Sequence, residues 1–374
     1  MDFTSALYLG MRHRSRDVPA WESFTTGVPA ALEETAAAEV VARRLAALQG
    51  CEAATLLPST LHLFWDLFGV LARDISEVWM DAGAYPIGRW GAERAAGLGI
   101  PVRSFRHHAP AALRRALERS ARHRSGDGCP VVLTDGFCPG CGEPAPLREY
   151  LEAVRQHGGM LVVDDTQALG VFGTPAIGTV YGRGGGGSLR RLSVAGPDVL
   201  LGCSLAKGFG VPVAALSGAR EAIRSFRARS RTRVHCSPPS IPVVRAAAHA
   251  LGLNHERGDA LRAELAQRVG RLRRRFRENG LRLVGGLFPV QTLPASARID
   301  AAALHAHLQA RGIQTVLHRA RRDSPPLVSF VVNATHSTED IDCAAAAVAE
   351  VTRPNATGSR RCKNEPILRH AAPT

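Results

Sequence analysis

The sequence lacks any long apolar run and any recognisable export signal. Its 374 residues contain no stretch of about eighteen consecutive apolar residues, the length that a membrane-spanning helix needs. The N-terminus has no charged region followed by an apolar stretch, as a secretory signal would. We therefore expect a cytoplasmic protein without a membrane span. Because 45% of the residues are hydrophobic, the chain can form a large core, and its length favours one large domain with a smaller one attached.

Motifs for nucleic-acid binding are also missing, although the formal net charge is +14. No helix-turn-helix or zinc-finger spacing is visible, and arginine is spread widely along the chain. Lysine is scarce, and Lys207 lies in an apolar setting. An arginine-rich solvated surface therefore explains the charge better than specific nucleic-acid binding does. The same charge suits a polyanionic substrate, such as a thioester of coenzyme A or of an acidic carrier protein.

A second CxxC pair is absent from this chain of eight cysteines. Without an export signal, the cysteines are expected to be free thiols. Cys138 and Cys141 form the one CxxC, in the run Cys-Pro-Gly-Cys, and a single pair is weak evidence for zinc. A loop shaped by glycine and proline is the favoured interpretation, with a metal or redox role as the alternative.

Two apolar runs that end in polar side chains organise the sequence. The first, Met160–Val163, is typical of a buried strand and runs directly into Asp164 and Asp165. The second follows about forty residues later and ends at Ser204, with Lys207 and two glycines directly behind it. Parallel α/β sheets bind ligands at the carboxyl ends of their strands. The sequence therefore predicts that Asp164 and Lys207 hold one cofactor between them.

Strand and helix patterns alternate over residues 50–220, which predicts βαβ units and a mostly parallel sheet. After this stretch, separate helices are expected at 241–253 and 260–278, a strand at 281–284, and a smaller α+β domain. Four consecutive glycines, Gly184–Gly187, predict either a mobile flap or a solvated loop. The expected divisions are an N-terminal segment and helix (1–50), a large cofactor-binding domain (51–235), a helical linker with the small domain (236–352) and a disordered basic tail (353–374).

The residue types at these positions match the needs of pyridoxal 5'-phosphate. This cofactor requires an amine for imine formation, an anion beside its pyridine nitrogen and donors for its phosphate. Lys207 can supply the amine and Asp164 the anion. Ser59, Thr60 and Leu61 begin a predicted helix, whose free N–H groups and positive end suit a phosphate, although an ordinary helix cap has the same sequence.

Two motifs, DDTQALG from Asp164 and SLAKGFG from Ser204, resemble those of the fold-type I pyridoxal-phosphate enzymes, specifically the α-oxoamine synthase group. The resemblance covers most of the chain and implies an aspartate-aminotransferase-like large domain with a mostly parallel sheet, plus a smaller C-terminal α+β domain. It implies that Lys207 is the Schiff-base lysine and that Asp164 faces the pyridine nitrogen. It also implies phosphate contacts from Ser204 and the helix start, and a homodimer with shared sites, in which Ser237 reaches the partner's cofactor.

Three active-site positions depart from that group. Tyr85 stands where its members stack a histidine on the cofactor ring, and a tyrosine can still stack. Gln167 replaces a second histidine and can hydrogen-bond the cofactor's phenolic oxygen without carrying charge. The strand at 327–331 has no arginine for a substrate carboxylate, so the nearby Arg319, Arg321 and Arg322 become candidates.

The resemblance implies a transferase that condenses the α-carbanion of an amino acid or amine with an acyl thioester. The three departures keep open an aminotransferase or a specialised condensation, cyclisation or elimination enzyme on the same scaffold. A cofactor-binding partner subunit without activity is less consistent with the retained Lys207, because such a subunit is expected to lose the imine lysine first.

Overall fold

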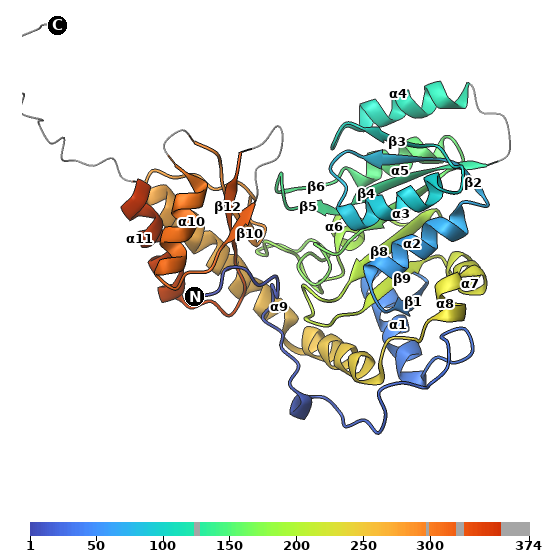
Figure 1. The fold of residues 1–374 in the computed structure, drawn as a ribbon, viewed down its shortest axis with the longest axis horizontal. Helices are drawn as coiled ribbons and strands as arrows, with labels where there is room; N and C mark the ends of the chain where they lie inside the picture. The colour runs from blue at the N-terminus through green and yellow to red at the C-terminus, as the bar shows by residue number, and fades with distance from the viewer. Residues whose placement is uncertain (123–127, 297–298, 319–324, 353–374) are drawn as a thin grey trace, which may run out of the picture.

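The computed structural model describes residues 1–122, 128–296, 299–318 and 325–352. Its main feature is a seven-stranded sheet in the order β1-β9-β8-β7-β4-β2-β3 (Figure 1). Only β9 runs antiparallel to its neighbours, so the sheet is mostly parallel, as predicted. Its strands are β1 (Ala53–Leu57), β2 (Ile75–Asp81), β3 (Val102–Phe105), β4 (Cys129–Asp135), β7 (Met160–Asp164), β8 (Val199–Ser204) and β9 (Ala214–Gly218).

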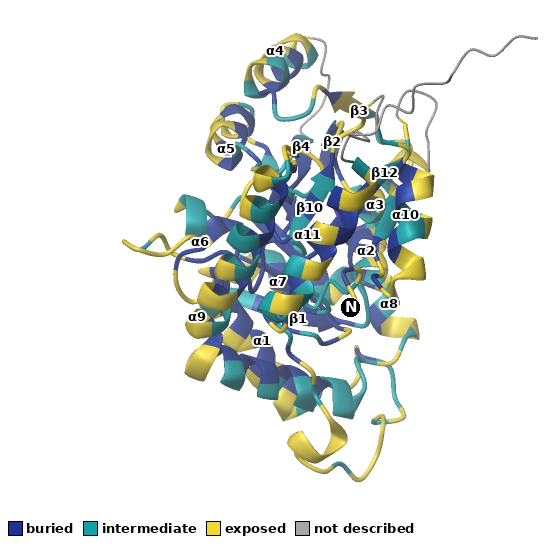
Figure 2. Cartoon of the chain, turned by 90° about the vertical axis from the view of Figure 1, so that its left-hand side faces the viewer, coloured by how far each residue is buried: buried dark blue, intermediate teal, exposed yellow. Residues whose placement is uncertain are grey.

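Helices cover both faces of this sheet because successive strand residues point to opposite sides. On β7, Val162 lies in the core formed with α2 (Thr60–Leu71), α3 (Pro86–Ala96) and α7 (Arg220–Arg229). Leu161 and Val163 lie in the opposite core, formed with α4 (Pro110–Ala121), α5 (Leu147–Arg155) and α6 (Ser188–Leu192). The central strands are accordingly buried, while the edge strand β3 and the outer helix faces are largely exposed (Figure 2).

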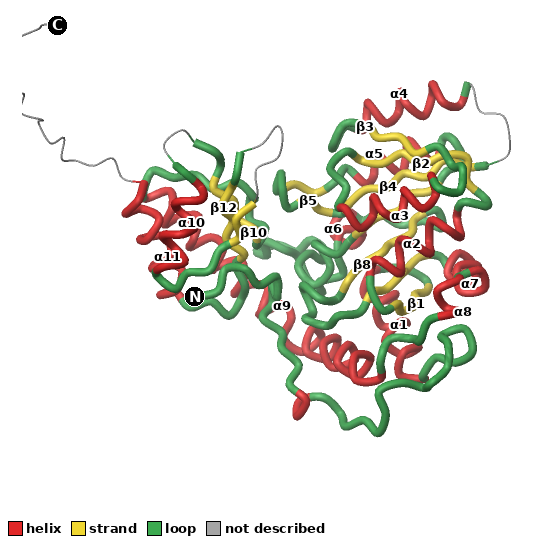
Figure 3. Tube along the Cα trace, viewed as in Figure 1, coloured by secondary structure: helices red, strands yellow, loops and turns green. Residues whose placement is uncertain are grey.

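One long helix, α9 (Ile241–Glu278), joins the large sheet to a smaller unit (Figure 3). The sequence-based division into two helices was wrong, because the chain continues helically through Gly252 and Gly258. The smaller unit has a three-stranded antiparallel sheet packed with helices. Its elements are β10 (Val290–Leu293), α10 (Ala301–Ala310), β11 (Val316–His318), β12 (Leu327–Val331) and α11 (Thr338–Thr352). The strand expected at 281–284 is absent, apart from a single bridge from Val284 to Thr292.

The N-terminal segment crosses both parts of the molecule. The Phe3 N–H donates to the Gln314 carbonyl at 2.9 Å, and the Phe3 carbonyl accepts from the Val331 N–H at 2.8 Å. Helix α1 (Ala36–Gln49) then packs against β1 and α9. The four domain divisions expected from the sequence remain a proposal, and the tail from residue 353 lies outside the described residues. Within the described part of the chain, no helix is both long and apolar enough to span a membrane.

The glycine run is neither a flap nor a solvated loop. Gly185, Gly186 and Gly187 are buried. The Gly184 N–H donates to Asp259 of α9 at 2.9 Å, and the Gly184 carbonyl accepts from Asn254 at the same distance. Glycine is required for close approach, since a Cβ on Gly187 would lie 1.9 Å from a carboxylate oxygen of Asp165. The absence of side chains at these glycines therefore lets the segment pack closely against its neighbours.

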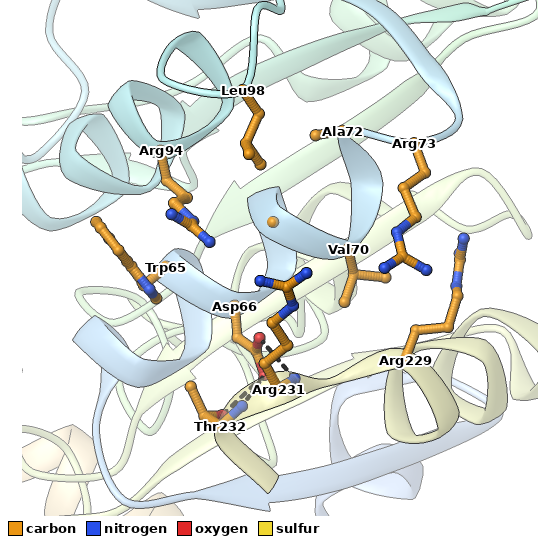
Figure 4. A pocket seen from close by; sticks show the side chains of 11 residues that line it. Trp65, Asp66, Val70, Ala72, Arg73, Arg94, Leu98, Arg229, Arg231 and Thr232 are labelled. Atoms are coloured by element: carbon orange, nitrogen blue, oxygen red, sulfur yellow. Dashed lines mark hydrogen bonds between the residues drawn. The ribbon is translucent and has the colours of Figure 1, made fainter. Parts of the chain in front are cut away.

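A buried carboxylate connects α2 to α8 (Arg231–His235). Asp66 accepts hydrogen bonds from the Ser230 hydroxyl, the Thr232 hydroxyl at 2.7 Å, and the backbone N–H groups of Arg231 at 3.1 Å and Thr232 at 3.2 Å (Figure 4). It forms the floor of a pocket of about 270 Å³. The side chains around this pocket include four arginines, Arg73, Arg94, Arg229 and Arg231. Asp66 thus satisfies the open N-terminus of α8 next to a strongly basic surface.

We predict that Asp66→Ala lowers the free energy of unfolding by about 3 kcal/mol, because it leaves several buried donors without an acceptor. Asp74→Ala is the matched control, since Asp74 pairs with Arg229 at 2.6 Å but its side chain is 51% exposed. The control should cost less than about 1 kcal/mol. Urea unfolding followed by tryptophan fluorescence measures both changes. Equal losses for the two variants would contradict the assigned role of Asp66.

Candidate active site

Asp164 and Lys207 lie at the carboxyl ends of neighbouring parallel strands. Asp164 is the last residue of β7 and stands opposite Gly202 of β8. Lys207 follows three residues after the end of β8. Asp164 is buried, and its Oδ1 accepts a hydrogen bond from the Thr166 N–H at 3.0 Å. The strand pairing therefore brings together the two residues that the sequence predicted to share a cofactor.

The surroundings move the proton affinities of this pair towards one another. Burial raises the pKa of Asp164, while hydrogen bonds from Thr166 and the charge of Lys207 oppose that shift. Burial lowers the pKa of Lys207, and the charges of Asp164 and Asp135 oppose it. A lysine with a lowered pKa holds more neutral amine, which is the nucleophilic form that imine formation requires. A cation bound beside Asp164 would favour its ionised form.

Tyr85 provides an aromatic face towards the lysine. The Lys207 Nζ lies 5.5 Å from the centroid of its ring, within cation–π range. Tyr85 directly precedes α3, and its backbone N–H donates to Oδ1 of Asp135 at 3.1 Å. Asp135 ends β4 and stands opposite Asp164, so one strand end positions the residue that faces the lysine on another. Burial, and then Asp164, raise the pKa of Asp135 well above its ordinary value.

Gln167 is held by a residue from the opposite end of the sequence. The Tyr8 hydroxyl donates to its Oε1 at 2.7 Å. Tyr8 is buried, and its ring packs edge-on against Phe288 of the smaller unit at 5.5 Å. Burial raises the pKa of Tyr8, which therefore keeps its proton and acts as a donor. With Oε1 occupied, the Nε2 group of Gln167 is the end that can donate to a ligand.

The predicted phosphate contacts follow two strands that end at the same level of the sheet. Leu57 of β1 and Ser204 of β8 both stand opposite Ala214 of β9. Ser59 caps α2, and its Oγ accepts from the His62 N–H at 3.3 Å. Thr60 and Leu61 form the first turn of this helix, where backbone N–H groups have no intrahelical partner. The Ser204 N–H donates to Oγ1 of Thr166 at 3.1 Å, which ties the β8 end to the β7 end.

Two predicted sets of site residues are not brought to this cluster by the described contacts. Ser237 lies exposed in the loop between α8 and α9, and its expected contact requires a partner subunit. Arg319, Arg321 and Arg322 lie outside the described residues. On β12, the strand without an arginine, Ser329 instead places its Oγ 2.6 Å from the Thr292 Oγ1 and 2.8 Å from the His318 Nε2.

Sequence reasoning gave no role to Tyr8, Asp135 or Thr166, which hold Gln167, Tyr85 and Ser204 respectively. Asp135 had a signal, because it also ends an apolar strand in acid. Tyr8 had none, since its partner is 159 residues away in the chain.

The donor set fits pyridoxal 5'-phosphate. A buried acid, an amine of lowered pKa, an aromatic face and a helix start lie at one edge of a parallel sheet. Comparison with known proteins gives a family match: a family model described as aminotransferase class I and II matches residues 26–348. The chain belongs to this family.

Curated relatives carry the name 8-amino-7-oxononanoate synthase. The enzyme of Alcanivorax borkumensis is 29% identical over 255 residues, which are 67% of this chain and 62% of that enzyme. The enzyme of Acidithiobacillus ferrooxidans (strain ATCC 53993) is 28% identical over 366 residues, which are 94% of this chain and 88% of that enzyme. The chain thus spans slightly less than two thirds of the first relative and most of the second.

Solved structures share the fold over most of this chain. A serine palmitoyltransferase from S. paucimobilis, solved with bound PLP and myriocin, superposes with a TM-score of 0.79 at 17% identity, covering 94% of this chain and 87% of that one. The 8-amino-7-oxononanoate synthase of Francisella tularensis has a TM-score of 0.71 at 16% identity, with coverages of 94% and 97%. The predicted fold type I architecture is confirmed.

A second buried acid, Asp165, lies behind the site. Its two carboxylate oxygens accept from the Ser188 N–H at 3.0 and 3.3 Å. Burial raises its pKa from 3.8 to about 7, against the lowering effect of Ser188. Because the pKa of Asp165 is higher in the folded protein than in the unfolded chain, the protonated acid stabilises the fold fully below its unfolded-state pKa. This stabilisation is lost as the pH rises through about 7.

We predict that Asp165→Asn flattens the pH dependence of stability between about pH 4 and 7. The three-unit shift corresponds to at most about 4 kcal/mol, so the thermal midpoint of the wild type should fall more steeply over this window than that of the variant. Asp17→Asn, at an exposed position, should keep the wild-type slope. Scanning fluorimetry across the window tests this, and parallel curves for wild type and Asp165→Asn would refute it.

Proposed function

We propose that the chain is a pyridoxal-phosphate-dependent transferase that joins the α-carbon of an amino acid or amine to the acyl group of a thioester. The observation that carries this is Lys207 beside Asp164, with the Tyr85 ring facing the amine at 5.5 Å. The names of the curated relatives support the reaction type. With an amino acid as donor, the balanced outcome is a new carbon–carbon bond, a released thiol and carbon dioxide.

Each residue of the cluster has a defined part in this proposal. When bound, pyridoxal phosphate supplies the electron sink that stabilises negative charge on the α-carbon of the substrate. Lys207 would hold the cofactor through Nζ, and its free amine would remove and return the α-proton of the substrate. Asp164 holds a proton at the pyridine nitrogen, and burial excludes water from this contact. Ser59, Thr60, Leu61 and Ser204 bind the phosphate.

The two substituted ring contacts keep binding but give up charge. Tyr85 covers the ring, and Gln167, oriented by Tyr8, donates to the phenolic oxygen. A phenol and an amide carry no positive charge, unlike a protonated histidine. Proton transfer at the α-carbon is therefore assigned to Lys207. The proposal includes a homodimer in the cytoplasm in which Ser237 completes the partner's site.

An aminotransferase is the second candidate, and one observation favours it. The family model that matches residues 26–348 is described as aminotransferase class I and II, and β12, which has no arginine, carries Ser329 in contact with Thr292 and His318. Transamination would transfer the amino group to a keto acid and would neither release a thiol nor consume a thioester.

Lys207→Ala should abolish the visible absorption of the bound cofactor and reduce turnover by at least about a thousandfold, because it removes the imine amine and the proton carrier. The assay combines a panel of amino acids with acyl-CoA thioesters and measures free thiol. Thiol release that depends on both an amino acid and wild-type Lys207 supports the condensation. Keto-acid formation without thiol release would favour transamination, and a wild type without cofactor absorption would refute the assignment.

Tyr85→Phe should keep cofactor affinity within about twofold, whereas Tyr85→Ala should weaken it about fivefold, since ring stacking is worth about 1 kcal/mol. Equilibrium titration of the apoenzyme with pyridoxal phosphate measures both constants. If Tyr85→Phe instead lowers turnover as much as Tyr85→Ala, the hydroxyl has a chemical role that the stacking assignment omits.

A further inference from the structure

The CxxC pair lies in a tight turn whose shape brings both sulfurs to one side. Strands β5 (Phe137–Cys138) and β6 (Glu143–Pro144) form a short antiparallel hairpin in which Cys138 stands opposite Glu143. The Gly142 N–H donates to the Cys138 carbonyl at 2.9 Å, and Gly142 adopts a φ of +77°, which favours glycine. The hairpin therefore holds the two thiols close together at its tip.

Two adjacent histidines from another part of the sheet face this turn. His107 and His108 follow β3, and their rings stack at a centroid distance of 3.8 Å. The His107 Nε2 lies 3.4 Å from the Cys141 Sγ, and the His108 Nδ1 lies 3.8 Å from the same sulfur. The ligand atoms of His107, Cys138 and Cys141 all lie within 4.8 Å of one another. Residue 108 also has a φ of +50°, rare for a side chain other than glycine.

These distances match the edges of a zinc coordination sphere. Bonds of about 2.3 Å to sulfur and about 2.05 Å to nitrogen, at a tetrahedral angle, place the two ligand atoms about 3.6 Å apart. The separations of 3.4 and 3.8 Å lie on either side of that value. A hydrogen bond alone would not require the second thiol or the second imidazole at this spot.

A buried carboxylate orients the histidine. Asp81 Oδ1 lies 2.6 Å from Nδ1 of His107, so a proton on Nδ1 is shared with the acid and the lone pair of Nε2 points to the sulfurs. The same carboxylate accepts from the Tyr150 hydroxyl at 3.0 Å and the His108 N–H at 3.1 Å. Gly83 makes room for the ring, since a Cβ there would come within 2.2 Å of Nδ1.

We propose that His107, Cys138 and Cys141 bind a zinc ion, with the fourth coordination position facing His108. Zinc prefers a neutral imidazole with a carboxylate on its other nitrogen and two thiolates as donors, so the two cysteines release their protons to solvent when the ion binds. A disulfide between the two cysteines would use neither His107 nor Asp81. The favoured sequence interpretation of this pair, a loop shaped by glycine and proline, took no account of histidines thirty residues earlier in the chain.

The zinc would join the segment after β3 to the β5–β6 hairpin, and Asp81, bonded to His107, connects a third segment; contacts of these segments also support the cofactor site. Asp81 Oδ1 accepts from the Gly83 N–H at 2.7 Å, in the loop that leads to Tyr85. Phe137, next to Cys138, stacks on Phe288 of the smaller unit at 4.4 Å. The ion is therefore a structural clamp beside the active site, and its ligands are positioning residues with no contact to the reacting atoms.

The test is the zinc content of the holoenzyme, which is purified under reducing conditions without a metal-affinity tag. Inductively coupled plasma mass spectrometry measures the zinc per chain. We expect about one zinc per chain in the wild type and in Cys343→Ser, an exposed-cysteine control on α11. Cys138→Ser, Cys141→Ser and His107→Ala should each lose most of it. Circular dichroism and cofactor absorption show whether each variant is folded, independently of any reaction.

Two further measurements use proteins that keep all three ligands. Wild type stripped by a chelator and reloaded with cobalt should show the visible bands of a tetrahedral thiolate site. Asp81→Asn should weaken zinc binding about 10- to 100-fold, because the orienting carboxylate is lost. Wild type without zinc, equal zinc in wild type and the cysteine variants, or a Cys138–Cys141 disulfide in a non-reduced peptide map would each overturn the proposal.

Discussion

A buried acid next to a partly buried amine is the constraint on which the active-site edge depends. Removing both groups from water is costly, and the cost is tolerable only where strand ends and backbone donors compensate. Here β7 and β8 supply neighbouring ends, and Thr166 bonds to both Asp164 and Ser204. Burial raises the pKa of Asp164 and lowers the pKa of Lys207, so the two values move towards each other. The same electrostatic situation prepares the lysine as a nucleophile and the acid as a partner for a cation.

Local signals in the sequence were sufficient for the sheet and for the residues that end its strands. Asp164 directly follows an apolar run and Lys207 comes three residues after the end of another strand, so their place at the sheet edge followed once the sheet was predicted to be parallel. Ser59 was recognisable as a helix cap, and the structure assigns it that geometry. Such features depend on neighbours within a few residues, which a single sequence displays completely.

Features set by distant contacts could not be read in the same way. The Tyr8–Gln167 bond joins positions 159 residues apart, and the histidines near Cys141 come from a different strand connection. The glycine run gave a wrong prediction because glycine signals freedom in isolation and close packing when a helix such as α9 covers it. Helix α9 was divided in two for the opposite reason, since its glycines weaken the local pattern while packing against α1 and α11 sustains the helix.

The chain's basic composition gives Lys207 a particular meaning. Lysine and arginine together number 47, yet lysine occurs only at 207 and 363. Among the described residues, arginine rather than lysine forms ion pairs with carboxylates, such as the bonds of Arg271 and Arg275 to Asp342. A guanidinium cannot lose its proton in a protein and cannot form the imine. Lys207, partly buried beside Asp164 in an arginine-rich chain, is therefore best explained by chemistry that needs a neutral primary amine.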